Sequence, residues 1–159
     1  MADTFCDYAR KFQAVIKKAG AETILYMPWD NVSTPPPPTL KDTADLYTRC
    51  GVDLGIKVAP VGLAFERAMK ERPAINLYAS DNANASLRGL YLTLGVLYAT
   101  IYERSPVGLA YRMGDVAPTY WEYSFWGVDR QKDWQLTDDE ATFLQQVAWE
   151  TVQDYQAGK

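Results

Sequence analysis

The stretch Leu77-Tyr-Ala-Ser-Asp-Asn-Ala-Asn-Ala-Ser-Leu-Arg-Gly-Leu-Tyr-Leu92 decides the fold expected for this chain. A short apolar run opens the stretch, a polar loop follows, and a long apolar helix begins near Ser86. Junctions of this kind are where α/β proteins place ligands and catalytic groups. The loop offers four candidate site residues: Asp81, Asn82, Asn84 and Ser86. Neither this stretch nor the rest of the chain contains a histidine, so the commonest catalytic base is missing.

Composition indicates one folded domain, residues 1–159. Of its 159 residues, 48% are hydrophobic, which is enough to bury a core. The 16 basic and 20 acidic residues form no basic patch, which argues against a nucleic-acid partner. The absence of an apolar run of about 18 residues argues against a membrane span. Charged residues recur through the N-terminal segment, so we expect a cytoplasmic protein, or a secreted or periplasmic one if the N-terminus is truncated.

The cysteine and histidine content limits the chemistry that we expect. Cys6 and Cys50 lie far apart in the sequence, and we expect two free core thiols in preference to a disulfide bond. Without histidine and with only these two cysteines, we predict neither a metal site nor a cofactor. The missing histidine also removes the usual Ser–His and Cys–His forms of nucleophilic catalysis.

Along the chain, helical patterns alternate with short apolar strands, which is typical of an α/β layered fold. Periodicity predicts about five helices, at residues 4–19, 40–54, 63–71, 86–102 and 137–155. Apolar runs predict strands at 23–27 and 56–59, with a weaker extended run at 75–78. The irregular parts are a proline-rich loop at 31–39 and an aromatic-rich segment at 107–135.

Two of the predicted helices carry clear start signals. Ser86 is the expected N-cap of the 86–102 helix, and Thr137-Asp-Asp-Glu140 forms a capping box before the last helix. The expected buried stripe of the 86–102 helix consists of Leu87, Leu90, Tyr91, Leu94, Leu97, Tyr98 and Ile101.

Four segments, taken in order, resemble the C-terminal half of an SGNH (GDSL-type) hydrolase. They are Leu25–Trp29, Val58–Phe65, Asp81 with Ser86–Leu92, and Leu144–Trp149. Their order is the one expected for bacterial members of the family. The resemblance implies a flavodoxin-like three-layer α/β/α fold, here partial, with a short parallel sheet of two or three strands. It also implies esterase or carbohydrate-esterase chemistry in intact members.

The catalytic blocks of that family are largely missing from this chain. The family's Gly-Asp-Ser block, which carries the nucleophile, and its Gly-x-Asn-Asp block, which helps to form the oxyanion hole, are both absent. Asp81-Asn-Ala-Asn84 aligns with the family's Asp-x-x-His motif, which puts Asn84 at the histidine position. Asparagine cannot accept and return a proton as imidazole does. We therefore expect a non-catalytic relative acting in binding or self-assembly, or else the C-terminal part of an esterase that needs a missing N-terminal segment.

The loop residues each have a functional and a structural interpretation. Asp81 is either a remnant catalytic acid or a carboxylate that caps the next helix, and the missing partners favour the cap. Asn82 and Asn84 either orient a ligand or form the turn, and the turn is favoured.

The tryptophans suggest a third hypothesis, a carbohydrate-binding protein that uses the Trp-rich segment 120–134. Trp29, Trp121 and Trp126 could form a sugar-stacking platform together with Trp134, although packing is the favoured role. Glu122 could pair with Asp81 in acid/base chemistry, but the sequence does not fix their separation.

The short sheet implies a partner. Strand 23–27 would expose an unpaired apolar edge, which proteins rarely leave uncovered. We therefore expect self-association, most simply a twofold homodimer that covers this edge. The family resemblance also implies a carbohydrate or an acylated small molecule as a ligand.

Overall fold

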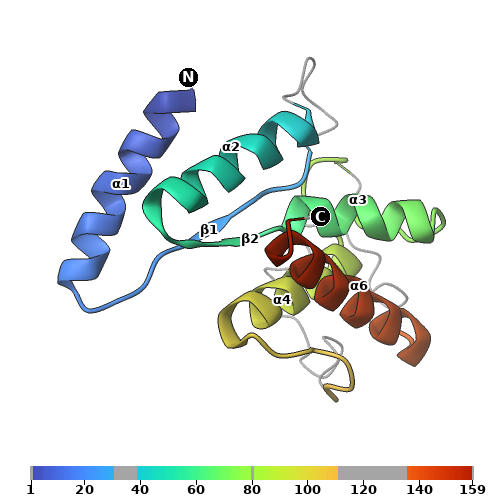
Figure 1. The fold of residues 1–159 in the computed structure, drawn as a ribbon. Coiled ribbons are helices and arrows are strands. Elements are labelled where there is room, and N and C mark those ends of the chain that lie inside the picture. The colour runs from blue at the N-terminus through green and yellow to red at the C-terminus, as the bar shows by residue number, and fades with distance from the viewer. Residues whose placement is uncertain (1, 31–38, 80, 111–135, 159) are drawn as a thin grey trace, which may run out of the picture.

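The computed structural model describes residues 2–30, 39–79, 81–110 and 136–158. These residues form a mixed α/β arrangement of five helices and a short two-stranded sheet, with α3, α4 and α6 grouped together (Figure 1). The helices are α1 (Ala2–Lys18), α2 (Leu40–Leu54), α3 (Val61–Glu71), α4 (Leu87–Tyr102) and α6 (Asp138–Gln156). The strands are β1 (Ile24–Tyr26) and β2 (Lys57–Ala59). The predicted helices and the two firm strands are therefore confirmed, within a few residues at their ends.

β1 and β2 pair in parallel, with Ile24 opposite Lys57 and Tyr26 opposite Ala59. The weaker run at 75–78 is not a third strand of the sheet in the part of the chain that the structure describes. Instead it forms an isolated antiparallel bridge with the chain that returns from the following loop, between Tyr78 and Ala85. Its backbone groups are thus paired locally, which leaves them unavailable to the sheet.

The core lies where α3, α4 and α6 meet. Its fully buried apolar side chains include Phe65, Leu77, Leu92, Val96, Leu144, Val147 and Val152. Gly89 allows α4 to approach the extended run closely, since a Cβ there would clash with the carbonyl oxygen of Leu77. The packing of α4 therefore fixes the run that leads into the 79–86 loop.

α4 buries a different face from the stripe that its periodicity predicts. Leu87 and Tyr91 are buried as expected, but Leu94 and Ile101 are each 47% exposed. The reason is that the helix's own apolar side chains occupy all of its sides, so no polar face indicates which side meets solvent. Among the described residues, no helix has the length and apolar character needed to cross a membrane.

Cys6 and Cys50 form a disulfide bond that joins α1 to α2, so the expectation of two free thiols is wrong. Their Cα atoms lie 5.5 Å apart although 44 positions separate them in the sequence. The same helix contact brings the rings of Phe5 and Tyr47 to a centroid distance of 4.8 Å. Sequence separation gave no sign of the bond because the two cysteines meet only when α1 packs on α2.

Candidate functional site

The 79–86 loop, described at every residue except 80, leads into α4 and folds back on itself as a closed turn. The backbone N–H of Ala79 donates to the carbonyl oxygen of Asn84 at 2.8 Å, and the N–H of Asn82 donates to that of Ala79 at 3.0 Å. Asn82 has a φ of 53°, in the left-handed region that asparagine tolerates better than most residues. Asn82 therefore has a clear role in forming the turn.

Asp81 organises this turn through its carboxylate. One oxygen accepts hydrogen bonds from the backbone N–H groups of Ala83 and Asn84, both at 2.9 Å. The other oxygen accepts from the side-chain amide of Asn84 at 2.5 Å. The hydrogen bonds from Asn84 and Ala83 lower the pKa of Asp81, because they stabilise its charged form.

The N-terminus of α4 is capped by Ser86, as predicted. Its hydroxyl oxygen accepts from the N–H of Gly89 at 3.3 Å and donates to the carbonyl oxygen of Asn76 at 2.7 Å. The favoured expectation that Asp81 caps this helix is wrong, because Ser86 is the N-cap and the Asp81 carboxylate binds Ala83 and Asn84 in the turn before it. The capping box at Thr137 and Glu140 is also confirmed.

Trp29 is brought to the same loop from the end of β1. Its indole Nε1–H donates to the carbonyl oxygen of Ala83 at 2.9 Å. Its ring stacks on that of Phe65, with a centroid distance of 4.6 Å and an angle of 10° between the planes. The indole is thus half-buried against the core, and this contact occupies a ring face that a sugar would need.

A second contact joins the loop region to the chain that follows β1. The Tyr78 hydroxyl donates to the backbone carbonyl oxygen of Asp30 at 3.1 Å. The Asp30 carboxylate in turn accepts from the N–H of Leu40 at the start of α2. The 79–86 loop therefore lies beside the carboxyl end of the sheet, which is where α/β folds commonly bind ligands.

The structure brings Trp29, Asp81, Asn82, Asn84 and Ser86 into one region. The other candidates, Trp121, Glu122 and Trp126, lie outside the described residues, as do Trp134 and most of the aromatic-rich segment. The Glu122–Asp81 pair thus stays a hypothesis from the sequence.

The chemistry available in this region is limited. It combines one exposed carboxylate with amides and a serine hydroxyl, and Asn84 offers no group that exchanges a proton near neutral pH. Across the described residues, no cluster of three or more His, Cys, Asp or Glu side chains is arranged to hold a metal ion. The region can donate and accept hydrogen bonds at the surface, and its ionisable groups are carboxylates, since the chain contains no imidazole.

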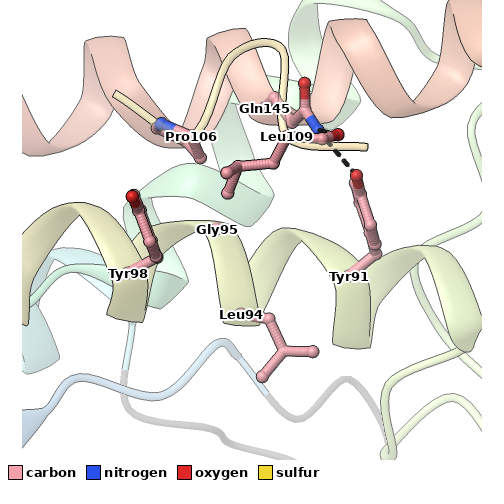
Figure 2. A pocket seen from close by; sticks show the side chains of 7 residues that line it. All are labelled: Tyr91, Leu94, Gly95, Tyr98, Pro106, Leu109 and Gln145. Carbon is pink, nitrogen blue, oxygen red and sulfur yellow. Dashed lines mark hydrogen bonds between the residues drawn. The ribbon is translucent and has the colours of Figure 1, made fainter. Parts of the chain in front are cut away.

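A separate pocket of about 250 Å³ lies between α4, α6 and residues 105–109 (Figure 2). It is lined by Tyr91, Leu94, Gly95, Tyr98, Pro106, Leu109 and Gln145. Figure 2 shows the rings of Tyr91 and Tyr98 rising from α4 on either side of the Leu109 side chain, while Leu94 points the opposite way. The lining is almost wholly apolar.

Gln145 holds the wall of this pocket in place. It is 3% exposed, and its amide nitrogen donates to the Tyr91 hydroxyl at 2.7 Å and to the carbonyl oxygen of Leu109 at 3.0 Å. Its side-chain oxygen accepts from the N–H of Gly108 at 3.0 Å. No pattern discussed above predicted this pocket. The available signal was a glutamine on the apolar side of the last predicted helix, beside Leu144.

Comparison of the chain with models of known protein families, with curated proteins and with solved structures finds no match.

Proposed function

We propose that this chain is a non-catalytic, SGNH-like domain that functions by self-association. The observation that carries the proposal is an exposed apolar surface formed by one strand and one helix. We call it the β1–α4 face, and it consists of Tyr26, Leu90, Leu94, Leu97 and Ile101. In this proposal the parallel strands and their helices form part of a flavodoxin-like three-layer fold. A second copy of the chain then covers the apolar surface that this partial fold leaves exposed.

α4 has the composition of a helix that is buried on all sides. Among its 16 residues Arg88 is the only charged one. Such a helix is normally enclosed by protein, yet Leu94 and Ile101 are each 47% exposed. Together with the half-buried Leu90 and Leu97, they repeat at helical spacing and form one continuous stripe.

β1 extends this surface. It pairs with β2 along one edge, and no other strand in the described residues pairs with its second edge. Tyr26, at the end of β1, is 37% exposed and its side chain interacts with Thr93 on the flank of the α4 stripe. Unpaired strand edges and apolar helix stripes are both surfaces that proteins ordinarily cover.

The 79–86 loop supports the non-catalytic part of the proposal. The family resemblance would require Asp81 to orient a histidine, but its carboxylate instead holds the backbone and side chain of Asn84. A structural role in stabilising the turn is enough to explain these contacts, and a catalytic role for Asp81 is not needed.

A charge placed in the β1–α4 face tests the proposal. We expect the wild type to sediment as a dimer and Leu94→Glu as a monomer, with the dissociation constant raised about tenfold or more because the carboxylate would have to lose its water. Val52→Glu, on an α2 side chain that is 76% exposed, is the matched control and should remain a dimer. A wild type that stays monomeric at all concentrations in sedimentation velocity contradicts the proposal.

We also propose a cellular compartment for this protein, on the basis of its disulfide bond. Disulfide bonds persist mainly in oxidising compartments. The Cys6–Cys50 bond therefore favours the secreted or periplasmic alternative over the cytoplasm.

Binding of a small apolar group, such as a short acyl chain, is a second candidate function. The pocket beside Gln145 favours it, since dry apolar cavities of about 150 Å³ already hold a benzene molecule. Its volume of about 250 Å³ leaves room for a larger group.

Filling the pocket tests this second function. Leu109→Phe should abolish the heat of binding of a short-chain alkyl ester in calorimetry, because the larger ring occupies the cavity. Val107→Phe, at a neighbouring side chain that is 47% exposed and does not line the pocket, should leave binding unchanged. Equal binding by the two variants, or no binding by the wild type, contradicts this candidate.

A further inference from the structure

We infer that Asn84 is an attachment site for an N-linked glycan, which the chain acquires as it passes through an oxidising secretory compartment. Asn84-Ala-Ser86 fits the Asn-x-Ser/Thr acceptor pattern of N-glycosylation, with a residue other than proline in the middle. A second match to the pattern, at residues 31–33, lies outside the described residues. The inference goes beyond the proposed self-association and rests on the proposed compartment.

The disulfide bond is the first structural observation that gives the pattern weight. Disulfide bonds persist in the secretory compartments in which proteins also receive N-linked glycans. Cys50 is fully buried and Cys6 is 7% exposed, so their bond is part of the folded interior and not a product of oxidation at the surface. A chain that folds with this bond meets the condition under which the acceptor pattern is used.

The position of Asn84 on the surface is the second observation. Asn84 is exposed, whereas Ala85 is 4% exposed and Leu87 is 6% exposed. The turn therefore directs Asn84 outward while the residues that follow it pack inward. A glycan is bulky and hydrophilic, so its attachment requires a position of this kind on the surface.

The hydrogen bonds of the turn are compatible with a glycan on Asn84. The amide nitrogen Nδ2 carries two hydrogens, and one of them donates to the Asp81 carboxylate at 2.5 Å. Glycosylation replaces one hydrogen and leaves the other for Asp81. The backbone N–H groups of Ala83 and Asn84 also donate to Asp81, and the glycan does not alter them. The turn therefore keeps its contacts after the glycan is attached.

The glycan is donated by an oligosaccharide carried on a lipid pyrophosphate. The Asn84 Nδ2 atom forms a bond to the anomeric carbon of the first sugar, and the bond from that carbon to the pyrophosphate oxygen breaks. The amide loses one proton and the lipid pyrophosphate leaves. In the folded chain the Ser86 hydroxyl, which the pattern requires, is engaged with Gly89 and Asn76. Transfer therefore takes place on the extended chain, before the turn forms.

Labelled release of the glycan tests the site directly. The chain is secreted from eukaryotic cells behind a cleavable signal and digested with peptide N-glycosidase in water enriched in oxygen-18. We expect peptide mass spectrometry to find labelled aspartate at position 84. Asn84→Gln and Ser86→Ala should lose the glycan at this position, whereas Ser86→Thr keeps both the pattern and a helix-capping hydroxyl and should retain it. Asn82→Gln, at an exposed asparagine outside the pattern, is the matched control and should also retain it.

Two ways of removing the glycan test its contact with Asp81. Peptide N-glycosidase converts Asn84 to aspartate, whereas an endoglycosidase leaves one sugar on the asparagine. The new carboxylate would face that of Asp81 where the amide now donates, and two like charges there repel. In an Asn31→Gln background, the aspartate product should melt at a lower temperature than the endoglycosidase product at neutral pH. The difference should narrow in acid, as one carboxylate binds a proton. Equal melting temperatures at neutral pH contradict the assignment.

The outcomes separate this inference from the compartment on which it rests. Mass spectrometry with and without reduction reports the state of Cys6 and Cys50 in the same secreted sample. A secreted chain that has the disulfide bond but no glycan at position 84 overturns the inference and leaves the compartment standing. Free thiols at positions 6 and 50 overturn the proposed compartment, whatever position 84 carries.

Discussion

Asp81 illustrates how the partners of one carboxylate decide its role. Three hydrogen bonds from Ala83 and Asn84 engage both of its oxygens. A histidine at position 84 would have provided a base, whereas the asparagine provides an amide that completes the turn. The side chain that the resemblance identifies as a catalytic acid therefore has a structural role that is sufficient to explain it.

Removing this carboxylate should destabilise the turn in a pH-dependent way. Its folded-state pKa is lowered from the ordinary value of 3.8, so the stabilisation is present above that value and is lost as the pH falls through the folded-state pKa. We expect Asp81→Ala to have a lower melting temperature than the wild type at neutral pH, with the difference narrowing in acid. Asp53→Ala, which removes an exposed aspartate on α2, is the matched control. A difference that stays constant down to acidic pH would contradict this role.

α1 depends on its connection to α2 more than on any other contact in its chain. A disulfide bond that closes a loop of this size stabilises a protein by about 4 kcal/mol in the chain-entropy model. In the described part of the chain, the Phe5–Tyr47 ring contact and the hydrogen bond from Gln13 to Leu54 also join α1 to α2. The covalent bond is the strongest of these connections.

A double variant, Cys6→Ser with Cys50→Ser, should lose a few kcal/mol of unfolding free energy, of the order expected for such a loop. We expect its α1 amides to exchange hydrogen faster than those of the wild type, while the α3, α4 and α6 amides change little. Protein concentration must be held fixed in the denaturation series, because dimerisation adds to the apparent stability. A dithiol reductant should lower wild-type stability and leave the variant unaffected. An unchanged rate of exchange in α1 would contradict this account.

Much of the architecture follows from local patterns in the sequence. The helices were predictable because caps and periodicity are local, as Ser86 and Thr137 show. The two strands were predictable because short apolar runs mark buried parallel strands. The exposed side of α4 was not predictable, since a helix with apolar residues on every side does not indicate which side faces solvent.

The parts of the candidate sites that were missed depend on contacts between distant segments. The hydrogen bond from Trp29 to Ala83 joins residues 54 positions apart, and that from Gln145 to Tyr91 spans the same separation. The pairing of Cys6 with Cys50 is of the same kind. The sequence placed four candidate residues in one loop, but tertiary packing alone brought Trp29 to them and decided which atoms meet.

The Cys6–Cys50 bond also makes part of the chain a closed covalent ring. Residues 6–50, with β1 and most of α2, belong to this ring. A protease that cuts one peptide bond inside it releases no fragment, because the two ends stay joined through sulfur. Such a nicked chain would migrate as one species on a non-reducing gel and separate into two only after reduction. Cleavage in this region would thus go unnoticed on a non-reducing gel.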